Sequence, residues 1–467
     1  MGNHKLRGKD LKNINYETDK AKSLAIDIMS MHYKHYTKQE KLKVLLDVKN
    51  NPEHYLSDPI LGVLASEFTC RSLKSKKEVQ LLKAPGEFKV FGRKHIADQT
   101  YQQMDLAMSL PIAERGALMP DAHMGYGLPI GGVLATRNAV VPYGVGLDIG
   151  CRMSLSLFDI APGYLKRKNY QFKMALKERT CFGSGGVLSI QQDHEILDRK
   201  EFTTTPLLRQ LHGKAVKQLG TSGSGNHFVE FGEVELVDGH DFGMPLGKYL
   251  GLLSHSGSRG LGAGIARHYT GIAREKCLLP NYAQHFAWLN LDTEEGMEYW
   301  MAMNLAGDYA KACHDQIHRH LCKYLGIKPV ATVENHHNFA WKEKIETGET
   351  LVIHRKGATP AGKGVLGIIP GSMTATGYIV RGKGEQSSLS SASHGAGRKM
   401  SRAQAKNSYT KSALKKVLSK AGVSLIGGGI DEAPIAYKDL DEVMASQTDL
   451  VDVIGRFTPK IVRMDKA

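Results

Sequence analysis

The first pair of residues in this sequence that could do chemistry is an aspartate and a cysteine three positions apart. Asp148 and Cys151 lie in the stretch G-V-G-L-D-I-G-C-R, residues 144–152. A carboxylate and a thiolate so placed can bind one metal ion, and the flanking glycines let the backbone approach that ion closely. Taken alone, such a pair is more typical of a turn-capping aspartate beside a buried thiol.

Three histidines further along the chain could complete such a metal site. Each stands beside small or polar residues: His227 in residues 219–230, His255 in residues 252–260 and His337 in residues 333–340. Imidazole nitrogens are common metal ligands, and the backbone amides of a glycine-rich loop can hold a phosphate. Arg259 follows His255 by four residues, and its planar guanidinium has the geometry to bind a phosphate.

A fourth histidine has the surroundings of a nucleophile. His394 lies in S-A-S-H-G-A-G-R-K-M-S-R, residues 391–402, where the neighbouring glycines leave it accessible and Arg398 and Arg402 follow. An accessible neutral imidazole beside arginines is suited to attack a phosphorus atom. The alternative is a glycine-rich helix start that happens to contain a histidine.

Four further residues carry weaker signals. Asp121 and His123 precede a glycine- and proline-rich segment. They either orient metal ligands or form the turn, and turn formation is the favoured role for Asp121. Arg355 and Lys356 precede a weak match to a phosphate-binding loop, residues 357–363, and are candidates for contacts with an anionic substrate.

Both strands and helices must position these residues. From about residue 86 the chain is rich in glycine, and the short apolar runs at residues 130–135 and 139–141 predict strands. Short strands mixed with helices indicate an α+β, or mixed α/β, fold in one large domain, residues 86–467. Helical spacing predicts the longer helices over residues 100–110, 206–219, 293–325 and 402–421.

A histidine pair on one of these helices is a second candidate for a metal site. His314 and His318 are four residues apart, which would place both on one helical face. The segment lacks the glutamate of an H-E-x-x-H motif, and charged residues surround the pair. A solvated helical face therefore explains these histidines better than a metal site.

The first 85 residues have a different character. Helical spacing recurs over residues 20–49 and 59–68, and glycine is sparse. No group of residues here suggests chemistry. We therefore expect a helical N-terminal extension, residues 1–85, that packs on the catalytic domain or docks a partner.

Composition narrows the class of protein. The 467 residues carry a net charge of +15 at pH 7, which favours phosphate-rich ligands, nucleic acid among them. Hydrophobic content is 42%, and neither a run of about 18 apolar residues nor a signal peptide is found, which predicts a cytoplasmic protein. The six scattered cysteines indicate reduced thiols.

Read in order, seven short motifs closely resemble those of the RtcB family of RNA ligases. They are D-x-G-C, G-N-H-F, S-H-S-G-S-R-G, H-N, H-R-K-G-A-T, P-G-S-M and S-H-G-A-G-R-x-M-S-R. The resemblance covers about residue 86 to the C-terminus. It implies a mixed α/β fold peculiar to the family, and the joining of RNA 3′-phosphate or 2′,3′-cyclic phosphate ends to 5′-hydroxyl ends in tRNA splicing or RNA repair. It also implies GTP and Mn²⁺ as cofactors, and an archease-like activator as a partner.

The resemblance also implies roles for single residues. Asp148, Cys151 and His227 would bind one Mn²⁺, and Cys151, His255 and His337 the other, with Cys151 as the bridge. Such mixed ligand sets can hold Mn²⁺ and would also accept Zn²⁺. His394 would be the nucleophile. Arg259, Arg398 and Arg402 would contact the substrate phosphate.

A third implied group binds the guanylate. Gly377 belongs to this group although it stands where the family commonly has a serine. The full set is Asn226, His227, Phe228, Val229, Glu230, His337, Asn338, Pro370, Gly371, Ser372, Met373, Gly377, His394, Gly395, Ala396, Gly397 and Lys466.

The mechanism that the resemblance implies has three steps. A ring nitrogen of His394 attacks the α-phosphorus of GTP, the guanylate passes to the RNA 3′-phosphate, and a 5′-hydroxyl then displaces GMP. A phosphodiesterase or nuclease with two metal ions could use the same ligands without a histidine nucleophile. A non-enzymatic RNA-binding module is disfavoured, because only 7% of the residues are aromatic and no stacking platform stands out.

Overall fold

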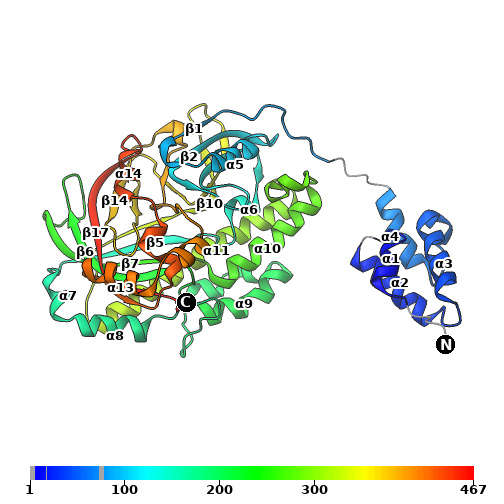
Figure 1. The fold of residues 1–467 in the computed structure, drawn as a ribbon, viewed down its shortest axis with the longest axis horizontal. Coiled ribbons are helices and arrows are strands. Elements are labelled where there is room, and N and C mark those ends of the chain that lie inside the picture. The colour runs from blue at the N-terminus through cyan, green and yellow to red at the C-terminus, as the bar shows by residue number, and fades with distance from the viewer. Residues whose placement is uncertain (1–5, 17, 73–77, 467) are drawn as a thin grey trace. The chain divides into compact units, whose positions relative to one another are not determined.

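The computed structural model describes residues 6–16, 18–72 and 78–466. The chain divides into two compact units, Met1–Lys77 and Glu78–Ala467 (Figure 1). Residues 73–77, which fall in the predicted extension, lie outside the described residues. No helix in the described part of the chain is both long and apolar enough to cross a membrane.

The first unit is helical. Side chains such as Leu11, Tyr16, Leu45 and Leu64 form a buried core of its own. The segment expected to be helical over residues 20–49 is interrupted, because Thr37 begins a new helix with a capping box to Glu40. The helices are α1 (Gly8–Lys12), α2 (Asp19–Met31), α3 (Lys38–Asn50) and α4 (Gly62–Ser72).

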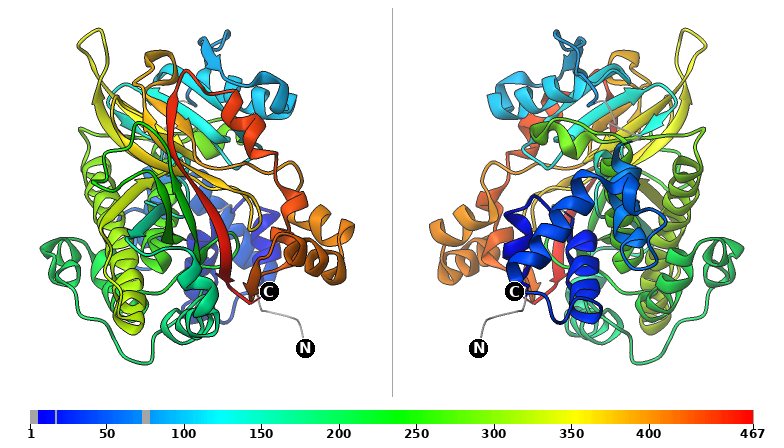
Figure 2. Two further views of the ribbon diagram at one scale, coloured as in Figure 1. Left: turned by 90° about the vertical axis from the view of Figure 1, so that its left-hand side faces the viewer. Right: turned by 90° about the vertical axis from the view of Figure 1, so that its right-hand side faces the viewer.

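The second unit is a mixed α/β structure, as the sequence predicts, and contains two large sheets. One sheet has the order β1-β2-β3-β11-β10. The other has the order β13-β14-β17-β6-β7-β5-β9, with β16 paired to the long strand β17, drawn in red in Figure 2. Two short pairs, β4–β8 and β12–β15, complete the described sheets.

The strands of the smaller sheet are β1 (Phe88–Val90), β2 (Ala113–His123), β3 (Ile130–Thr136), β10 (Asn338–Lys344) and β11 (Thr350–Lys356). Those of the larger sheet are β5 (Arg152–Phe158), β6 (Phe228–Leu236), β7 (Gly247–Ser256), β9 (Ala331–His336), β13 (Leu366–Ile369), β14 (Gly377–Gly382), β16 (Ser424–Ile426) and β17 (Val451–Met464). The short pairs are β4 (Ala139–Val140) with β8 (Leu289–Asn290), and β12 (Ala358–Pro360) with β15 (Ser391–Ser393).

Three of the four longer predicted helices form over nearly the expected residues, whereas the fourth is broken. The segment 402–421 forms two helices because Tyr409 is extended and the side chain of Thr410 caps the second helix at Ala413. The helices of this unit are α5 (Asp98–Met108), α6 (Pro142–Val145), α7 (Gly163–Arg167), α8 (Asn169–Arg179), α9 (Pro206–Gln218), α10 (Arg259–Lys276), α11 (Glu294–Leu325), α12 (Arg402–Ser408), α13 (Lys411–Lys420) and α14 (Leu440–Ala445).

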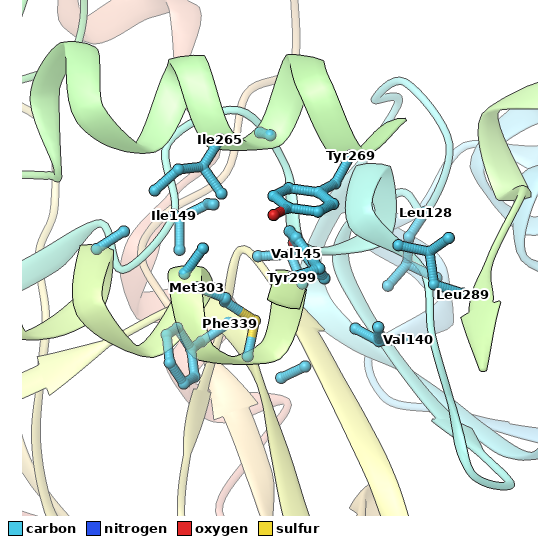
Figure 3. Close-up of a cluster of buried hydrophobic side chains, with 14 of the residues drawn as sticks. Leu128, Val140, Val145, Ile149, Ile265, Tyr269, Leu289, Tyr299, Met303 and Phe339 are labelled. Carbon is cyan, nitrogen blue, oxygen red and sulfur yellow. The ribbon is translucent and has the colours of Figure 1, made fainter. Parts of the chain in front are cut away.

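Helix α11 fixes the larger sheet from one side. Its residues Tyr299 and Met303 pack in a buried cluster with Ile265 and Tyr269 of α10 (Figure 3). Further along, α11 contacts β5 and β7, the strands that adjoin the candidate site. Burying such large apolar side chains is worth about 1.5–3 kcal/mol each, which makes this helix pair a rigid support.

The histidine pair on α11 is buried, which corrects the expectation of a solvated face. His314 Nδ1 and His318 Nε2 lie 2.6 and 2.8 Å from the Ser254 hydroxyl, within hydrogen-bond distance. His318 Nδ1 also lies 2.8 Å from the Ser156 hydroxyl. The pair therefore satisfies buried serines of β5 and β7 and offers no open ligand set.

Candidate metal centre and adjoining cavity

Five potential metal ligands converge where strands of the larger sheet end. Asp148 and Cys151 lie in the turn between α6 and β5, and His227 immediately precedes β6. His255 is on β7, which pairs with both of those strands. His337 is the single residue between β9 and β10, where the chain crosses from the larger sheet to the smaller one.

The ligand atoms are separated by distances that suit a shared ion. Cys151 Sγ is 3.4 Å from His227 Nε2 and 3.2 Å from His255 Nε2. His255 Nε2 is 3.2 Å from His337 Nε2, and His227 Nε2 is 3.0 Å from Asp148 Oδ2. Ligand atoms bound about 2.1 Å from one tetrahedral ion lie about 3.4 Å apart.

These atoms form two overlapping groups. One consists of Cys151, His255 and His337, the other of Asp148, Cys151 and His227, and the ligand atoms within each group lie within 4.8 Å of one another. Cys151 belongs to both. Nitrogen, sulfur and carboxylate donors in such groups fit a transition-metal ion.

Burial sets the protonation of these ligands. It lowers the pKa of His255 to about 3 and that of His337 well below its usual range, so both rings are neutral and can bind a cation. Burial and the Asp148 charge raise the pKa of the Cys151 thiol well above its usual range. The thiolate therefore forms only when a cation compensates its charge.

Glycines leave the space that two ligands occupy. A Cβ atom on Gly257 would lie 2.1 Å from Asp148 Oδ1, and one on Gly223 would lie 1.8 Å from His227 Nδ1. No side chain fits at either position unless the ligand moves. This explains the glycines in the stretches around His227 and His255.

Gly257→Ala should lower the affinity for a divalent metal by about 10- to 100-fold, because the added methyl group displaces the Asp148 carboxylate. Titration of Mn²⁺ into the metal-free protein measures the change. Gly271→Ala is the matched control, since a Cβ atom there would have no atom within 4 Å. Equal affinities in the two variants would contradict the prediction.

A cavity of about 380 Å³ opens beside the ligands and contains His394. The His394 ring lies 4.9 Å, centre to centre, from the His337 ring. The candidate nucleophile and the candidate metal ligands thus share one cavity.

Asp121 holds His394 in place, which corrects the favoured turn role. Its Oδ2 accepts hydrogen bonds from His394 Nδ1 at 2.6 Å and from the His394 backbone at 3.2 Å. Although burial alone would raise it, the pKa of Asp121 lies below its usual value because of the neighbouring His394 and Lys438. An ionised Asp121 accepts a hydrogen bond from the proton of Nδ1, which leaves the lone pair of the neutral ring on Nε2.

Most of the predicted site residues line this cavity together with His123 and Lys356. They are Asp148, Cys151, Asn226, His227, Phe228, Glu230, His255, His337, Asn338, Pro370, Gly371, Ser372, Met373, His394, Gly395, Ala396, Gly397, Arg398 and Arg402.

Four predicted site residues lie outside the lining. Val229 faces the hydrophobic core, because side chains alternate along β6. Gly377 packs against Pro370 and so supports the cavity wall from behind. Lys466 is exposed. Arg259 donates to the Thr221 hydroxyl at 3.1 Å and to the Gly183 carbonyl.

Arg398 and Arg402 are both held by a carboxylate that the sequence interpretation missed. Glu432 is 3% exposed, and its two oxygens accept from Arg398 Nη1, at 3.2 Å, and from Arg402 Nη1. Asp431 also accepts from Arg402 at 2.8 Å, and the Tyr437 hydroxyl donates to Glu432. Two carboxylates balance the two guanidinium charges, so an entering phosphate must compete for the arginines.

The expectation for Arg355 is corrected, whereas Lys356 lines the cavity. Arg355 is 1% exposed and forms a bidentate pair with Glu343, 2.5 and 2.9 Å away, so it cannot reach a ligand. Burial lowers the pKa of Lys356 to about 7. An arriving anion would favour its charged form.

Glu432 and Tyr437 gave little signal because they lie in D-E-A-P-I-A-Y-K-D, residues 431–439, which contains no histidine or cysteine. Two adjacent acidic residues close to a proline are typical of a turn. Their contacts with Arg398 and Arg402 depend on how the loop before α14 packs against α12, which the local sequence does not specify.

Comparison with known proteins bears out the resemblance seen in the motifs. The family model described as tRNA-splicing ligase RtcB matches residues 102–211 and 199–465. The RNA-splicing ligase RtcB1 of Escherichia coli is 32% identical over 388 residues, covering 77% of this chain and 92% of that protein. The tRNA-splicing ligase RtcB of Nanoarchaeum equitans is 29% identical over 432 residues, covering 77% and 90%. The RNA-splicing ligase RtcB homolog 1 of Entamoeba histolytica is 28% identical over 425 residues, covering 76% and 81%.

Proposed function

The chain belongs to the RtcB family of tRNA-splicing ligases, and we propose that it joins RNA 3′-phosphate or 2′,3′-cyclic phosphate ends to 5′-hydroxyl ends. GTP is the energy source in this proposal, and an archease-like protein is its activator. The observation that carries the proposal is the shared cavity, in which His394 lies beside His337, a member of one metal-ligand group.

The residues present fit two Mn²⁺ ions. Asp148, Cys151 and His227 would hold one ion, and Cys151, His255 and His337 the other. A shared thiolate reduces the repulsion between two dications. When bound, such ions neutralise the charge that gathers on phosphate groups during transfer.

His394 supplies the nucleophile in this proposal. With Nδ1 held by Asp121, its Nε2 attacks the α-phosphorus of GTP, a bond from phosphorus to nitrogen forms, and pyrophosphate leaves. A 2′,3′-cyclic phosphate end is first hydrolysed by water to a 3′-phosphate. The guanylate then passes from the histidine to the RNA 3′-phosphate, and the bond between phosphorus and nitrogen breaks. Attack by the 5′-hydroxyl on that phosphorus forms the new ester bond and releases GMP.

The wall of the cavity provides groups for a guanine base and its phosphate. Burial raises the pKa of Glu230 well above its usual range, so its neutral carboxyl can both donate and accept a hydrogen bond. The backbone of Gly395, with no side chain, lets a ligand approach His394 closely. Arg398 and Arg402 would contact the phosphates once these compete with Glu432.

Incubation with GTP labelled at the α-phosphate tests the proposal. We expect label to stay on the protein in an acid-labile bond when Mn²⁺ is present, and none with GTP labelled at the γ-phosphate, because that group leaves in pyrophosphate. A nuclease with two metal ions would cleave RNA without retaining label. Absence of label from the metal-loaded protein with GTP would reject the ligase proposal.

A further inference from the structure

A rigidly held, exposed tyrosine stands at the edge of the cavity. Tyr126 lies in the turn between β2 and β3 and is 73% exposed. Gln103 of α5 donates to the carbonyl groups on both sides of it, those of Gly125 and Gly127, at 2.6 and 2.5 Å. The same amide accepts from the Gly125 backbone at 3.2 Å, and Lys356 donates to the Tyr126 carbonyl.

So many hydrogen bonds to the backbone are unusual for a surface turn. Loop tips with small residues are ordinarily free to move, and a large apolar ring is usually turned inward. Here four hydrogen bonds fix the backbone of the turn while leaving the ring in solvent. A ring held in this way loses little conformational entropy when a flat ligand stacks on it.

Further aromatic rings and positively charged side chains lie next to Tyr126. The ring centres of Tyr126 and His285 are 6.2 Å apart, and His285 stacks on Tyr143 at 4.9 Å and 19°. Arg274 donates to His285 Nδ1 at 2.8 Å. Lys356 lies over the Tyr143 ring, 5.3 Å from its centre.

The same residues connect this surface to the cavity. Lys356, which holds the Tyr126 turn, lines the cavity with His394. The lining also includes His123, three residues before Tyr126, and Leu147, which is 40% exposed. The Tyr126 turn therefore adjoins the part of the cavity wall that Lys356 forms.

We propose that Tyr126 is a stacking platform for a base of the single-stranded RNA whose end enters the cavity, with Arg274 and Lys356 beside it to attract the phosphate backbone. The inference rests on the proposed ligase function and identifies where the protein would bind its RNA substrate. Aromatic rings combined with positive charge are the features that bind single strands with little regard to sequence.

Tyr126→Ala tests the platform. We expect the KM for the RNA substrate to rise about tenfold, the loss typical of one removed stacking contact. The kcat and the transfer of label from GTP should stay unchanged, because the ring contacts neither His394 nor the metal ligands. Tyr126→Trp should keep the KM near its original value, since it restores a stacking ring.

Tyr170→Ala is the matched control, since Tyr170 is 77% exposed on α8. The platform is rejected if both alanine variants have the KM of the unaltered protein, or if Tyr126→Ala weakens only the response to an activator protein. The binding of an RNA with unreactive ends, followed by fluorescence anisotropy, separates this question from catalysis. If the unaltered protein takes up no label, the ligase proposal fails, while weaker RNA binding by Tyr126→Ala alone would still support the platform.

Discussion

Replacing His394 with alanine should abolish the transfer of guanylate from GTP to the protein while leaving bound metal unchanged. In the proposed mechanism the imidazole forms the bond to phosphorus, and the loss of a covalent nucleophile costs on the order of 10⁶-fold in rate. The metal ligands keep their positions, because His394 is held by Asp121 rather than by a ligand. The measurements are retained α-label and metal content by elemental analysis.

An exposed histidine far from the cavity provides the control for this experiment. His268 of α10 is exposed and does not line the cavity. His268→Ala should take up label as the unaltered protein does. Label retained by the His394→Ala protein would show that another residue is the nucleophile.

Replacing Cys151 with alanine should remove both metal ions, whereas replacing His337 with alanine should remove only one. Cys151 belongs to both ligand groups, and His337 to one of them. Each group would lose one of its three protein ligands without Cys151, and the chelate effect would fall for both ions at once. Metal content after dialysis, measured by elemental analysis, distinguishes the two variants.

A buried cysteine outside the cluster controls for the loss of a thiol as such. Cys277, at the end of α10, is 7% exposed. Cys277→Ala should retain its full metal content. If the Cys151→Ala protein kept one ion at its original affinity, the thiolate would not be shared and the ions would be bound independently.

Sequence patterns anticipated the ligand cluster because its members have rare chemistry and flexible neighbours. Histidine and cysteine beside glycine stand out along a chain, as at Cys151 and His255. The pairing of β7 with both β5 and β6 could not be read in this way, since strand order depends on contacts between distant segments. The ordered motifs supplied that information indirectly, through resemblance to a family.

The interpretation failed where a residue's role depends on its partner. Asp121 was expected to form a turn because of the glycine- and proline-rich segment beside it, and Arg355 to reach a ligand because of its positive charge. In the fold, Asp121 meets His394 and Arg355 meets Glu343. A charged residue cannot be assigned to substrate or to structure until the opposite charge nearest to it is known.

Short-range signals divide the predicted helix over residues 402–421, as they do the segment over residues 20–49. Apolar spacing continues across residues 402–421, which favours a single helix. Thr410 nevertheless starts a second one, because its hydroxyl caps the Ala413 amide and Tyr409 is extended. A capping hydroxyl starts a new helix locally, and the spacing of apolar residues gives no sign of it.

The place of His337 at the crossing between the two sheets has a consequence for how the chain matures. One ligand set includes atoms from the larger sheet and from the residue at which the chain leaves it for the smaller one. The set closes only when β9 has paired with β5, a contact between segments far apart in the chain. Capture of a metal ion by this set therefore requires that synthesis has passed His337, and a nascent chain truncated before that residue would not hold the ion there.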